Sequence, residues 1–493
     1  MPLFRYQREG VQFLERRNGR ALLADEMGLG KTVQALGWLD HRHSLRPVVV
    51  VCPTTARLNW QKEIATWLGE RAFLPYGTRA DASGYSGEEF IVIHYDIAVF
   101  WLDWLKALSP AVVIVDEAHL IKTATARRTK AVKALCRGVP HVIGLTGTPI
   151  INRPIEAWNI IQLVDKKALN CNWFRYTRRY CGPRHNGFAW TYTGATRTKE
   201  LHALLTSTLM LRRTKAEVLD SLPPKIYSFV PLELDNRAEY QKAETHFLRY
   251  VRETEGRAAA DRAKRAETLT RITALRDLAA KGKLAAALDW IADTIELNKL
   301  VVFAVHRATI DAVCARFTAA AVKIDGGVSE KDRALAIERF QTDPDCRLFV
   351  GQIQAAGTAI TLTAASHVAF LSLPWTPGET AQAADRVHRL GQTQQVTVYY
   401  LLAHQTIDEH MARLIDSKRR VLDAVLDGAA STTPSILREL LRLYERGKDE
   451  PTTLPDKDGP RVCQDDRAGI RRSRPGGEDR LLESRERSTL RPA

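Results

Sequence analysis

The feature that most constrains the fold is an apolar run at residues 21–24 (Ala-Leu-Leu-Ala) that leads into a glycine-rich segment at residues 25–32 (Asp-Glu-Met-Gly-Leu-Gly-Lys-Thr). This order indicates a strand, a tight turn and then a helix. Backbone N–H groups of such a turn bind phosphate oxygens, and the following helix directs its positive dipole end at the same anion. The segment therefore predicts a nucleoside-triphosphate site on an α/β scaffold.

The residue types of this turn suit separate tasks in phosphate binding. Gly28 and Gly30 lack a β-carbon, so the chain can bend tightly and approach the anion. Lys31 can reach the β- and γ-phosphates, and Thr32 can place its hydroxyl on Mg²⁺. The generic pattern has a glycine five residues before Gly30, where this chain has Asp25.

A pair of carboxylates follows a second apolar run, residues 112–115 (Val-Val-Ile-Val). Ligands of parallel sheets bind at the carboxyl ends of the strands, which is where Asp116 and Glu117 fall. Asp116 can hold Mg²⁺, and Glu117 can orient and deprotonate an attacking water. Together with the glycine-rich turn, the pair predicts ATP hydrolysis with Mg²⁺.

Hydrolysis also needs positive charge to stabilise the negative charge that develops on the γ-phosphate. Arg386 and Arg389 lie three residues apart, so they share one face if their segment is a helix. Guanidinium groups stay protonated and offer several donors in a plane, and an arginine finger contributes roughly 10³–10⁵ in rate. Taken alone, the segment equally fits a surface helix with solvated arginines.

Short apolar segments alternate with helix-length stretches in two parts of the chain. This pattern predicts two parallel sheets covered by helices on both faces, in an α/β fold that looks duplicated. The expected strands are residues 21–24, 48–52, 90–94, 112–115 and 142–145 in the first part, and 300–305, 322–324, 348–353, 368–373 and 396–402 in the second.

The same pattern sets the predicted domain boundaries. We expect a first lobe at residues 1–225, with a mostly helical insertion at about 154–220. A second lobe is expected at 226–448, with a helical insertion at about 235–298 and closing helices, followed by a disordered, charged tail at 449–493. The first insertion is rich in aromatic residues and arginine, so it is either a nucleic-acid contact or an ordinary packed subdomain.

Composition narrows the partners and the compartment. The formal net charge is +15, which favours a polyanionic partner, although a basic enzyme without one is an alternative. The seven cysteines form no Cys-x-x-Cys pair, and Cys171, Cys181 and His185 match no zinc spacing, so neither a zinc site nor a redox pair is indicated. An odd number of unpaired thiols suits a reducing cytoplasm. We find no apolar signal core or membrane-spanning run, so we expect a cytoplasmic protein (nucleoid-associated or in an infected host cell) with no membrane partner.

The motifs resemble, in order and from Tyr6 to about Leu426, the Swi/Snf-type ATPases of helicase superfamily two. Tyr6-Gln7 resembles the Q motif, and residues 25–32 resemble the family's own variant of the P-loop, which accounts for Asp25. Arg386 and Arg389 fall on motif VI. Residues 363–368 (Thr-Ala-Ala-Ser-His-Val), followed by Pro-Trp at 374–375, are most similar to the annealing-helicase, fork-remodelling subgroup.

The resemblance implies two tandem RecA-like lobes that close on ATP and Mg²⁺. The implied site residues fall into five groups: for ATP, Gln7 (reading adenine), Asp25, Gly28, Leu29, Gly30, Lys31 and Thr32; for the metal, Thr32 and Asp116; for catalysis, Glu117, Arg386 and Arg389; for coupling, Thr146, Gly147, Thr148 and Gly357; and for DNA, Pro53, Thr54 and Trp60. The family usually has glycine where Ala359 stands, which leaves the local backbone geometry of motif V open.

The implied activity is movement along double-stranded or forked DNA without strand separation. The lobes would contact mainly the phosphate backbone, so little sequence preference is expected. Two alternatives stay open: a strand-separating DNA or RNA helicase of the same superfamily, and a DNA-binding regulatory protein with a vestigial ATP site. No histone-reading or nuclease module is recognisable, which predicts a bare motor.

Overall fold

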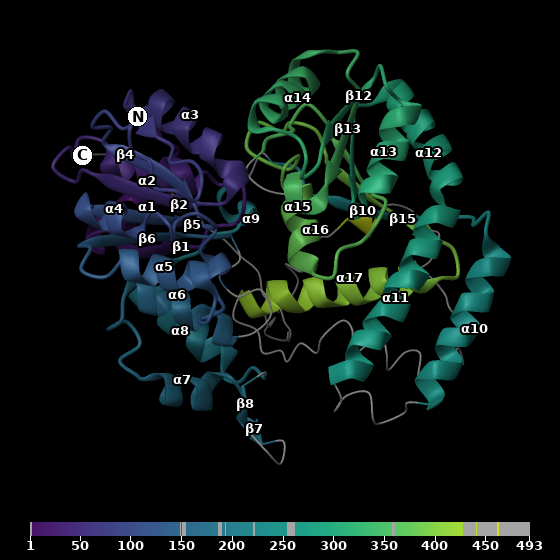
Figure 1. Cartoon of the computed structure of the whole chain (residues 1–493), viewed down its shortest axis with the longest axis horizontal. Helices are drawn as coiled ribbons and strands as arrows, with labels where there is room; N and C mark the ends of the chain where they lie inside the picture. The colour runs from purple at the N-terminus through teal and green to yellow at the C-terminus, as the bar shows by residue number, and fades with distance from the viewer. Residues whose placement is uncertain are drawn as a thin grey trace, which may run out of the picture.

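The computed structural model describes residues 2–147, 149, 154–185, 190–192, 194–219, 222–253, 262–356, 360–426, 440 and 461–462. Two lobes lie side by side, each built on one sheet (Figure 1). The first sheet has the order β3-β4-β2-β5-β6-β1-β9, and its paired strands are all parallel. Its strands are β1 (Arg20–Leu23), β2 (Val48–Cys52), β3 (Ala72–Phe73), β4 (Phe90–His94), β5 (Val112–Asp116), β6 (His141–Leu145) and β9 (Met210–Leu211).

The second sheet has the order β12-β13-β11-β14-β15-β10-β16. Its pairs are parallel except the last, in which β16 runs antiparallel to β10. Its strands are β10 (Ile226–Leu232), β11 (Leu300–Ala304), β12 (Ala321–Ile324), β13 (Leu348–Gln352), β14 (His367–Phe370), β15 (Thr397–Ala403) and β16 (Arg461–Val462).

The two sheets are wound in the same way. Numbering the first six strands of each lobe in chain order, both sheets have the spatial order third, fourth, second, fifth, sixth, first. The strands are buried on both faces, because alternate residues of β2 enter different hydrophobic cores: Val49 and Val51 one, Val48 and Val50 the other. The prediction of two tandem RecA-like α/β lobes is confirmed.

Helices cover both sheets, and several extend beyond them (Figure 1). In the first lobe they are α1 (Arg5–Arg16), α2 (Lys31–Leu39), α3 (Arg57–Leu68), α4 (Leu102–Ala107), α5 (Arg127–Leu135), α6 (Ala157–Val164), α7 (Trp173–Tyr180), α8 (Thr198–Thr208) and α9 (Lys215–Val218), with 3₁₀ turns η1 (Thr54–Ala56), η2 (Ala118–Ile121) and η3 (Pro154–Glu156) and the hairpin β7 (Arg184–His185) and β8 (Trp190–Thr191). In the second lobe they are α10 (Arg237–Glu253), α11 (Arg262–Gly282), α12 (Leu284–Leu297), α13 (Arg307–Arg316), α14 (Glu330–Thr342), α15 (Ile353–Ala356), α16 (Pro377–Ala384) and α17 (Ile407–Leu426). Across the described part of the chain, no helix has both the length and the apolar content needed to cross a bilayer.

The structure differs from the sequence predictions at several strands. The strand β9 lies inside the predicted first insertion yet pairs with β1, and two residues are too few to leave an apolar pattern. The strand β10 was not predicted because Ser228 and Pro231 interrupt its apolar sequence. Within the predicted disordered tail, Arg461 and Val462 instead pair with β10, and the rest of residues 449–493 lies outside the described part of the chain.

Candidate active site

The sheet order of the first lobe brings the predicted motifs together. The strands β5, β6 and β1 are neighbours, with Leu145 of β6 opposite both Leu23 of β1 and Asp116 of β5. The segments after these strands therefore begin at the same edge of the sheet, which is the usual ligand edge of parallel sheets.

The glycine-rich turn has the backbone that the sequence requires. Gly28 and Gly30 have φ angles of 89° and 71°, a left-handed region that residues with side chains rarely adopt. Gly30 is the N-cap of α2, so the helix begins directly at Lys31. A β-carbon on Gly30 would lie 2.6 Å from Nε2 of Gln7, so Gln7 packs against the turn. Its role as an adenine reader stays a prediction.

Lys31 lies at the end of this turn, where α2 begins. Its Nζ donates to the carbonyl oxygens of Asp25, at 2.7 Å, and Glu26, at 3.3 Å. Burial lowers the pKa of Lys31, against the attraction of Glu117 and other carboxylates. A half-buried ammonium among carbonyls and carboxylates is well suited to bind phosphate when a nucleotide enters.

The side chain of Asp25 is surrounded by protein groups and does not face the space where ATP was expected to contact it. Its side chain is fully buried and accepts hydrogen bonds from Arg213 at 2.6 and 3.1 Å and from Gln34 at 3.0 Å. The carboxylate therefore fastens the turn to the segment after β9, and only the backbone of Asp25 remains to contact a nucleotide. A glycine at this position could not form the ion pair.

The acidic pair is held in one orientation by its own hydrogen bonds. Asp116 accepts from the indole Nε1 of Trp60 at 2.8 Å and from the backbone N–H of Glu117 at 2.9 Å. Glu117 has a φ of 49°, a strained conformation for a residue with a side chain and one that is common at functional sites.

The two carboxyls differ in acidity. Burial, and then the charge of Glu117, raises the pKa of Asp116 to about 6. Burial opposes ionisation of Glu117 too, but the His119 ring and the charges of Lys31 and Arg386 lower its pKa to about 2. Glu117 is therefore ionised at neutral pH, as a base for water requires. The raised pKa of Asp116 marks a buried carboxylate that lacks sufficient positive charge, which fits a Mg²⁺ ligand.

The predicted DNA contact at Trp60 is wrong. The side chain of Trp60 is 1% exposed and donates to Asp116, so it orients the carboxylate and cannot reach a duplex. The prediction came from the resemblance of this segment to the family's DNA-contacting motif and not from a signal of Trp60 itself. Pro53 is half-buried and Thr54 is exposed, so their contacts with DNA stay predictions.

The predicted coupling residues link the acidic motif to the glycine-rich turn. Oγ1 of Thr146 lies 3.1 Å from Nδ1 of His119. A β-carbon on Gly147 would lie 2.6 Å from the side chain of Met27, so this segment packs directly on the turn. The other two predicted coupling residues, Thr148 and Gly357, lie outside the described part of the chain.

The second lobe contributes side chains to the same site. Nε2 of Gln382, in α16, donates to Oε1 of Glu117 at 3.3 Å. Arg386 is 3% exposed and close enough to Glu117 to lower its pKa. The α-helix expected to carry both arginines ends at Ala384, so Arg386 and Arg389 lie in the turns that follow it.

Arg389 lies against the glycine-rich turn. A β-carbon on Gly28 would be 3.5 Å from the β-carbon of Arg389. One Nη of Arg389 donates to the carbonyl of Ile360 at 2.9 Å and to Thr361 at 2.7 Å, while its Nε is buried with no hydrogen-bond partner in the described structure. Burial and the neighbouring Arg386 lower the pKa of Arg389 to about 9. A half-buried guanidinium with a spare donor favours an anion at this place.

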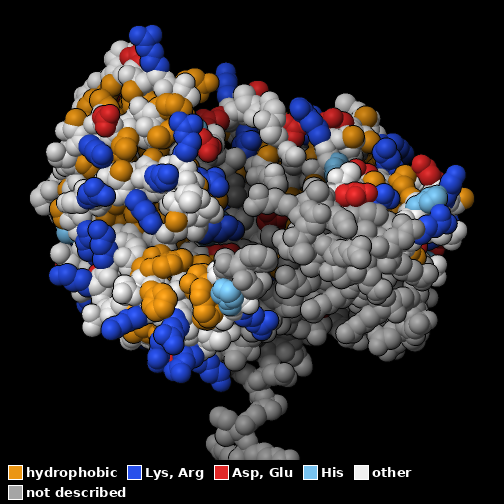
Figure 2. All heavy atoms as spheres, turned by 60° about the horizontal axis from the view of Figure 1, so that its bottom comes forward, with side chains coloured by type: hydrophobic (Ala, Val, Ile, Leu, Met, Phe, Trp, Pro, Cys, Tyr) orange, Lys and Arg blue, Asp and Glu red, His pale blue; other side chains and the backbone are white. Residues whose placement is uncertain are grey.

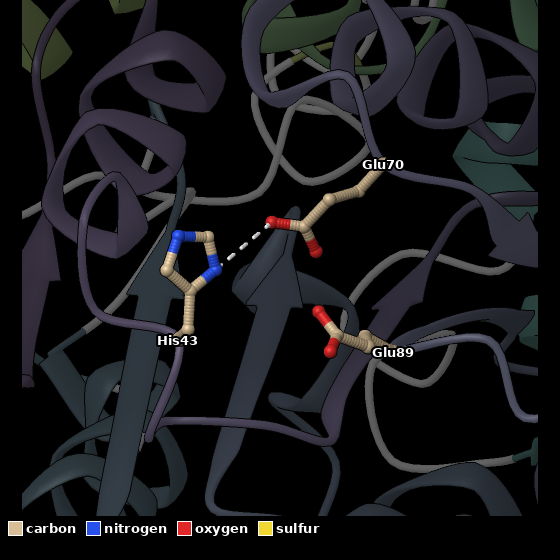
Figure 3. Close-up of side chains that lie close together, drawn as sticks. All are labelled: His43, Glu70 and Glu89. Carbon is tan, nitrogen blue, oxygen red and sulfur yellow. Dashed lines mark ion pairs between the residues drawn. The ribbon is translucent and has the colours of Figure 1, made fainter.

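A separate group of possible metal ligands, His43, Glu70 and Glu89, does not make a metal site (Figure 3). The guanidinium of Arg46 lies 2.7 Å from Glu70 and 3.4 Å from Glu89. His43 is 4.0 Å from Glu70. Because Arg46 already neutralises both carboxylates, a divalent cation would have to displace it.

The aromatic and basic insertion is partly packed and partly exposed. Tyr176 and Tyr180 are buried, whereas Trp173, Phe174 and Trp190 are 42%, 59% and 59% exposed. Hydrophobic side chains gather among Lys and Arg on this face of the first lobe (Figure 2). The buried tyrosines fit an ordinary packed subdomain, and a nucleic-acid contact through the exposed aromatic side chains stays a prediction.

The fold and the site define a P-loop NTPase in which two RecA-like lobes meet at one nucleotide site. The SNF2-related domain family matches residues 6–283, and the helicase conserved C-terminal domain family matches residues 282–391. The chain belongs to the SNF2-related family of helicase-like ATPases, which confirms the predicted resemblance.

The curated relatives are longer proteins. The human "DNA annealing helicase and endonuclease ZRANB3" is 35% identical over 86% of this chain and 40% of its own length. The Caenorhabditis elegans "SWI/SNF-related matrix-associated actin-dependent regulator of chromatin subfamily A-like protein 1 homolog" is 34% identical over 86% of this chain and 62% of its own length. Among solved structures, the "Sulfolobus solfataricus SWI2/SNF2 ATPase core in complex with dsDNA" is 24% identical, with a TM-score of 0.41, and the match covers 87% of this chain and 94% of that one.

Proposed function

We propose that this chain is a DNA-dependent ATPase that moves along double-stranded DNA without separating its strands. The observation that carries the proposal is that side chains of both lobes meet at the glycine-rich turn and the acidic pair. Arg386 and Arg389 of the second lobe lie beside Glu117 and the glycine-rich turn of the first. Family membership supports ATP as the nucleotide, and the names of the ZRANB3 relatives support DNA as the partner.

Each residue of the site has a task in ATP hydrolysis. Lys31 and the N–H groups of the turn bind the β- and γ-phosphates. Glu117 holds the attacking water and accepts its proton, since it is ionised at neutral pH. Arg386 and Arg389 stabilise the charge that develops on the γ-phosphate. Thr32 and Asp116 would hold Mg²⁺, which supplies positive charge at the same phosphates when bound.

Hydrolysis can drive motion because the site is divided between lobes. Gln382 bonds to Glu117 and Arg389 packs on Gly28 across the two lobes, so both contacts would be lost if the lobes separated. Loss of the γ-phosphate removes the anion that these cations share, so closure becomes less favourable. Repeated closure and release would shift one lobe along a strand relative to the other.

Contact with DNA would be made mainly through phosphates. The net charge of +15 supports a polyanionic partner of either duplex or forked form. Thr54 is exposed next to half-buried Pro53 and is a candidate contact for the DNA backbone.

A cytoplasmic location belongs to the same proposal, and the unpaired state of the six described cysteines supports it.

The proposal is tested by phosphate release measured side by side without nucleic acid and with single-stranded DNA, duplex DNA, forked DNA and RNA. We expect the largest stimulation with duplex or forked DNA, and displacement of a third strand from a triplex without unwinding of a plain duplex. Unwinding of the duplex, or preferential stimulation by RNA, would support the helicase alternatives. No stimulation at any salt concentration would support a vestigial ATP site.

A further inference from the structure

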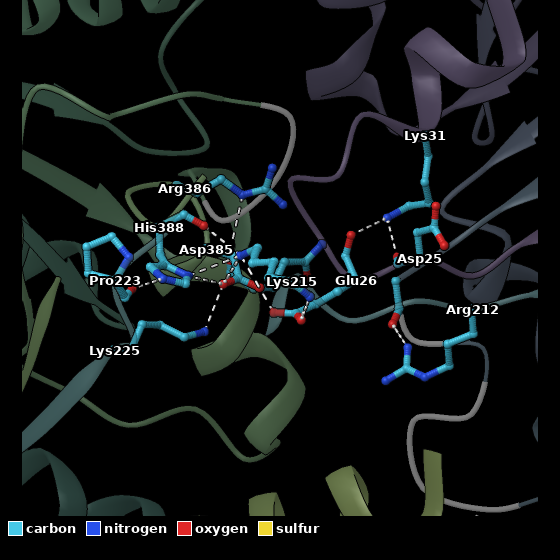
Figure 4. Close-up of polar contacts among 12 residues, drawn as sticks. Asp25, Glu26, Lys31, Arg212, Lys215, Pro223, Lys225, Asp385, Arg386 and His388 are labelled. Atoms are coloured by element: carbon cyan, nitrogen blue, oxygen red, sulfur yellow. Dashed lines mark hydrogen bonds and ion pairs between the residues drawn. The ribbon is translucent and has the colours of Figure 1, made fainter. Parts of the chain in front are cut away.

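A buried cluster of charged side chains connects the two lobes beside the nucleotide site (Figure 4). At its centre is Lys215, the first residue of α9, whose side chain is 5% exposed. Its backbone N–H donates to Oε2 of Glu26 at 2.7 Å, and the backbone N–H of Glu26 donates to the carbonyl of Arg213 at 2.9 Å. A β-carbon on Gly28 would lie 3.3 Å from Cε of Lys215. Lys215 is therefore fixed to the glycine-rich turn of the first lobe.

The ammonium of Lys215 reaches into the second lobe. Its Nζ donates to Oδ1 of Asp385 at 2.8 Å and to the backbone carbonyl of His388 at 2.6 Å. Asp385 immediately precedes Arg386, and His388 immediately precedes Arg389. One side chain of the first lobe thus holds the residue before each of the two arginines.

A second lysine shares the same carboxylate from the other side. Lys225 donates to Oδ1 of Asp385 at 2.8 Å. Lys225 directly precedes β10, and Ile226 of β10 pairs with Thr397 of the second sheet. The bond from Lys225 is therefore internal to the second lobe, whereas the bond from Lys215 crosses between lobes at the same distance.

His388 is arranged to accept this contact. Its Nδ1 lies 3.3 Å from Nζ of Lys215, and its Nε2 lies 2.7 Å from the carbonyl oxygen of Pro223. Burial and the nearby lysines lower the pKa of His388 to about 4, so the ring is neutral at physiological pH. A neutral ring with its proton on Nε2 donates to Pro223 and accepts from Lys215.

The charges of the cluster have partners in an open as well as a closed arrangement. Burial opposes ionisation of Asp385, but the attraction of Lys215 and Lys225 holds its pKa well below the usual range. Oε1 of Glu26 lies 3.7 Å from Nζ of Lys215 within the first lobe. If the lobes separate, Asp385 keeps Lys225 and Lys215 keeps Glu26, so opening leaves no buried charge alone.

We propose that Lys215 is a positioning residue that binds Asp385 and the His388 carbonyl on lobe closure, and so sets Arg386 and Arg389 against the glycine-rich turn. The inference rests on the proposed function, since it assigns the arginines to hydrolysis. It adds a closure-sensitive contact outside the set of side chains expected to touch ATP. Lys215 acts through its neighbours, so it should affect closure and turnover more than nucleotide affinity.

The test measures lobe closure separately from hydrolysis. Dyes on unnatural amino acids at Leu58 of α3 and Leu335 of α14, both exposed, report closure by single-molecule energy transfer in Mg²⁺, ADP and beryllium fluoride. Those helices approach one another, as the 3.8 Å separation of Arg57 and Glu330 shows. Lys215→Met should lower the closed-to-open ratio about tenfold, the loss expected for a hydrogen bond between charged groups. It should lower kcat for ATP to a similar extent with little change in KM.

Lys225→Met is the matched control, because it removes a bond to the same oxygen from within the second lobe. We expect it to change the closed-to-open ratio by less than about threefold, and Lys215→Arg to restore most of the closure lost in Lys215→Met. Equal losses in Lys215→Met and Lys225→Met, or unchanged closure in Lys215→Met, would overturn the inference. If Lys215→Met closes less than the wild-type chain but the wild-type chain shows no DNA-stimulated hydrolysis, the role of Lys215 in closure stands and the proposed function fails.

Discussion

The ion pair between Arg213 and Asp25 offers a stability test of how the glycine-rich turn is anchored. Arg213→Met removes two hydrogen bonds to Asp25, at 2.6 and 3.1 Å, one to Gln34 at 3.0 Å and one to the carbonyl of Tyr6. Asp25 then stays fully buried with Gln34 as its remaining side-chain donor. Breaking a buried pair in this way costs about 3–5 kcal/mol of unfolding free energy. At roughly 2–4 °C per kcal/mol for a lobe of this size, the first lobe should melt about 10 °C lower.

The assay is thermal unfolding followed by calorimetry, with Arg179→Met as the control. Arg179 also makes two hydrogen bonds to one carboxylate, that of Glu200, at 2.5 and 2.8 Å, but the two side chains are 50% and 39% exposed. Its removal should leave the melting temperature unchanged, because exposed ion pairs contribute little. Adding Asp25→Asn to Arg213→Met should recover part of the loss, since the buried charge is then gone. Equal melting temperatures of the Arg213→Met and Arg179→Met variants would refute the anchoring role.

Three further predictions concern the nucleotide site. Lys31→Ala should abolish turnover, because Lys31 is the one lysine within residues 25–32. Phosphate release near the wild-type rate would contradict this. Trp60→Phe removes the hydrogen bond to Asp116 and should weaken Mg²⁺-dependent activity by about 10–100-fold, because that bond supports a metal ligand. DNA affinity should stay unchanged in a filter-binding assay. A loss of DNA affinity would instead show that Trp60 contacts DNA. Because the pKa of Asp116 is raised to about 6, protons should compete with Mg²⁺ for this carboxylate as the pH falls through 6. Below pH 6 the apparent Mg²⁺ affinity should fall about tenfold per pH unit. A Mg²⁺ affinity that does not change between pH 5 and 7 would exclude Asp116 as a ligand.

The parts of the site that the sequence predicted are those whose signals are local. The glycine-rich turn is recognisable because two glycines, both with positive φ, and the lysine that begins the helix fall within residues 28–31. The buried parallel strands were predictable because both of their faces are covered, which leaves continuous apolar runs such as Val48–Cys52.

The remaining features depend on contacts between distant positions. Lys215 and Asp385 are 170 residues apart, and no pattern within either segment indicates the other. Trp60 was assigned to the wrong partner because its indole reaches Asp116, 56 residues further along the chain. The helix expected around Arg386 ends at Ala384. The backbone then turns, and Arg386 lies near Glu117 of the first lobe.

The central claim is that one ATP site is shared between two lobes and that the second lobe supplies the charge for hydrolysis. The most direct measurement is phosphate release by the wild-type chain and Arg389→Ala with saturating duplex DNA, beside the ATP affinity of each without DNA. We expect Arg389→Ala to lose roughly 10³–10⁵ in kcat while its Kd for ATP changes little. Hydrolysis that survives in Arg389→Ala, or is lost together with ATP binding, would contradict a site completed by the second lobe.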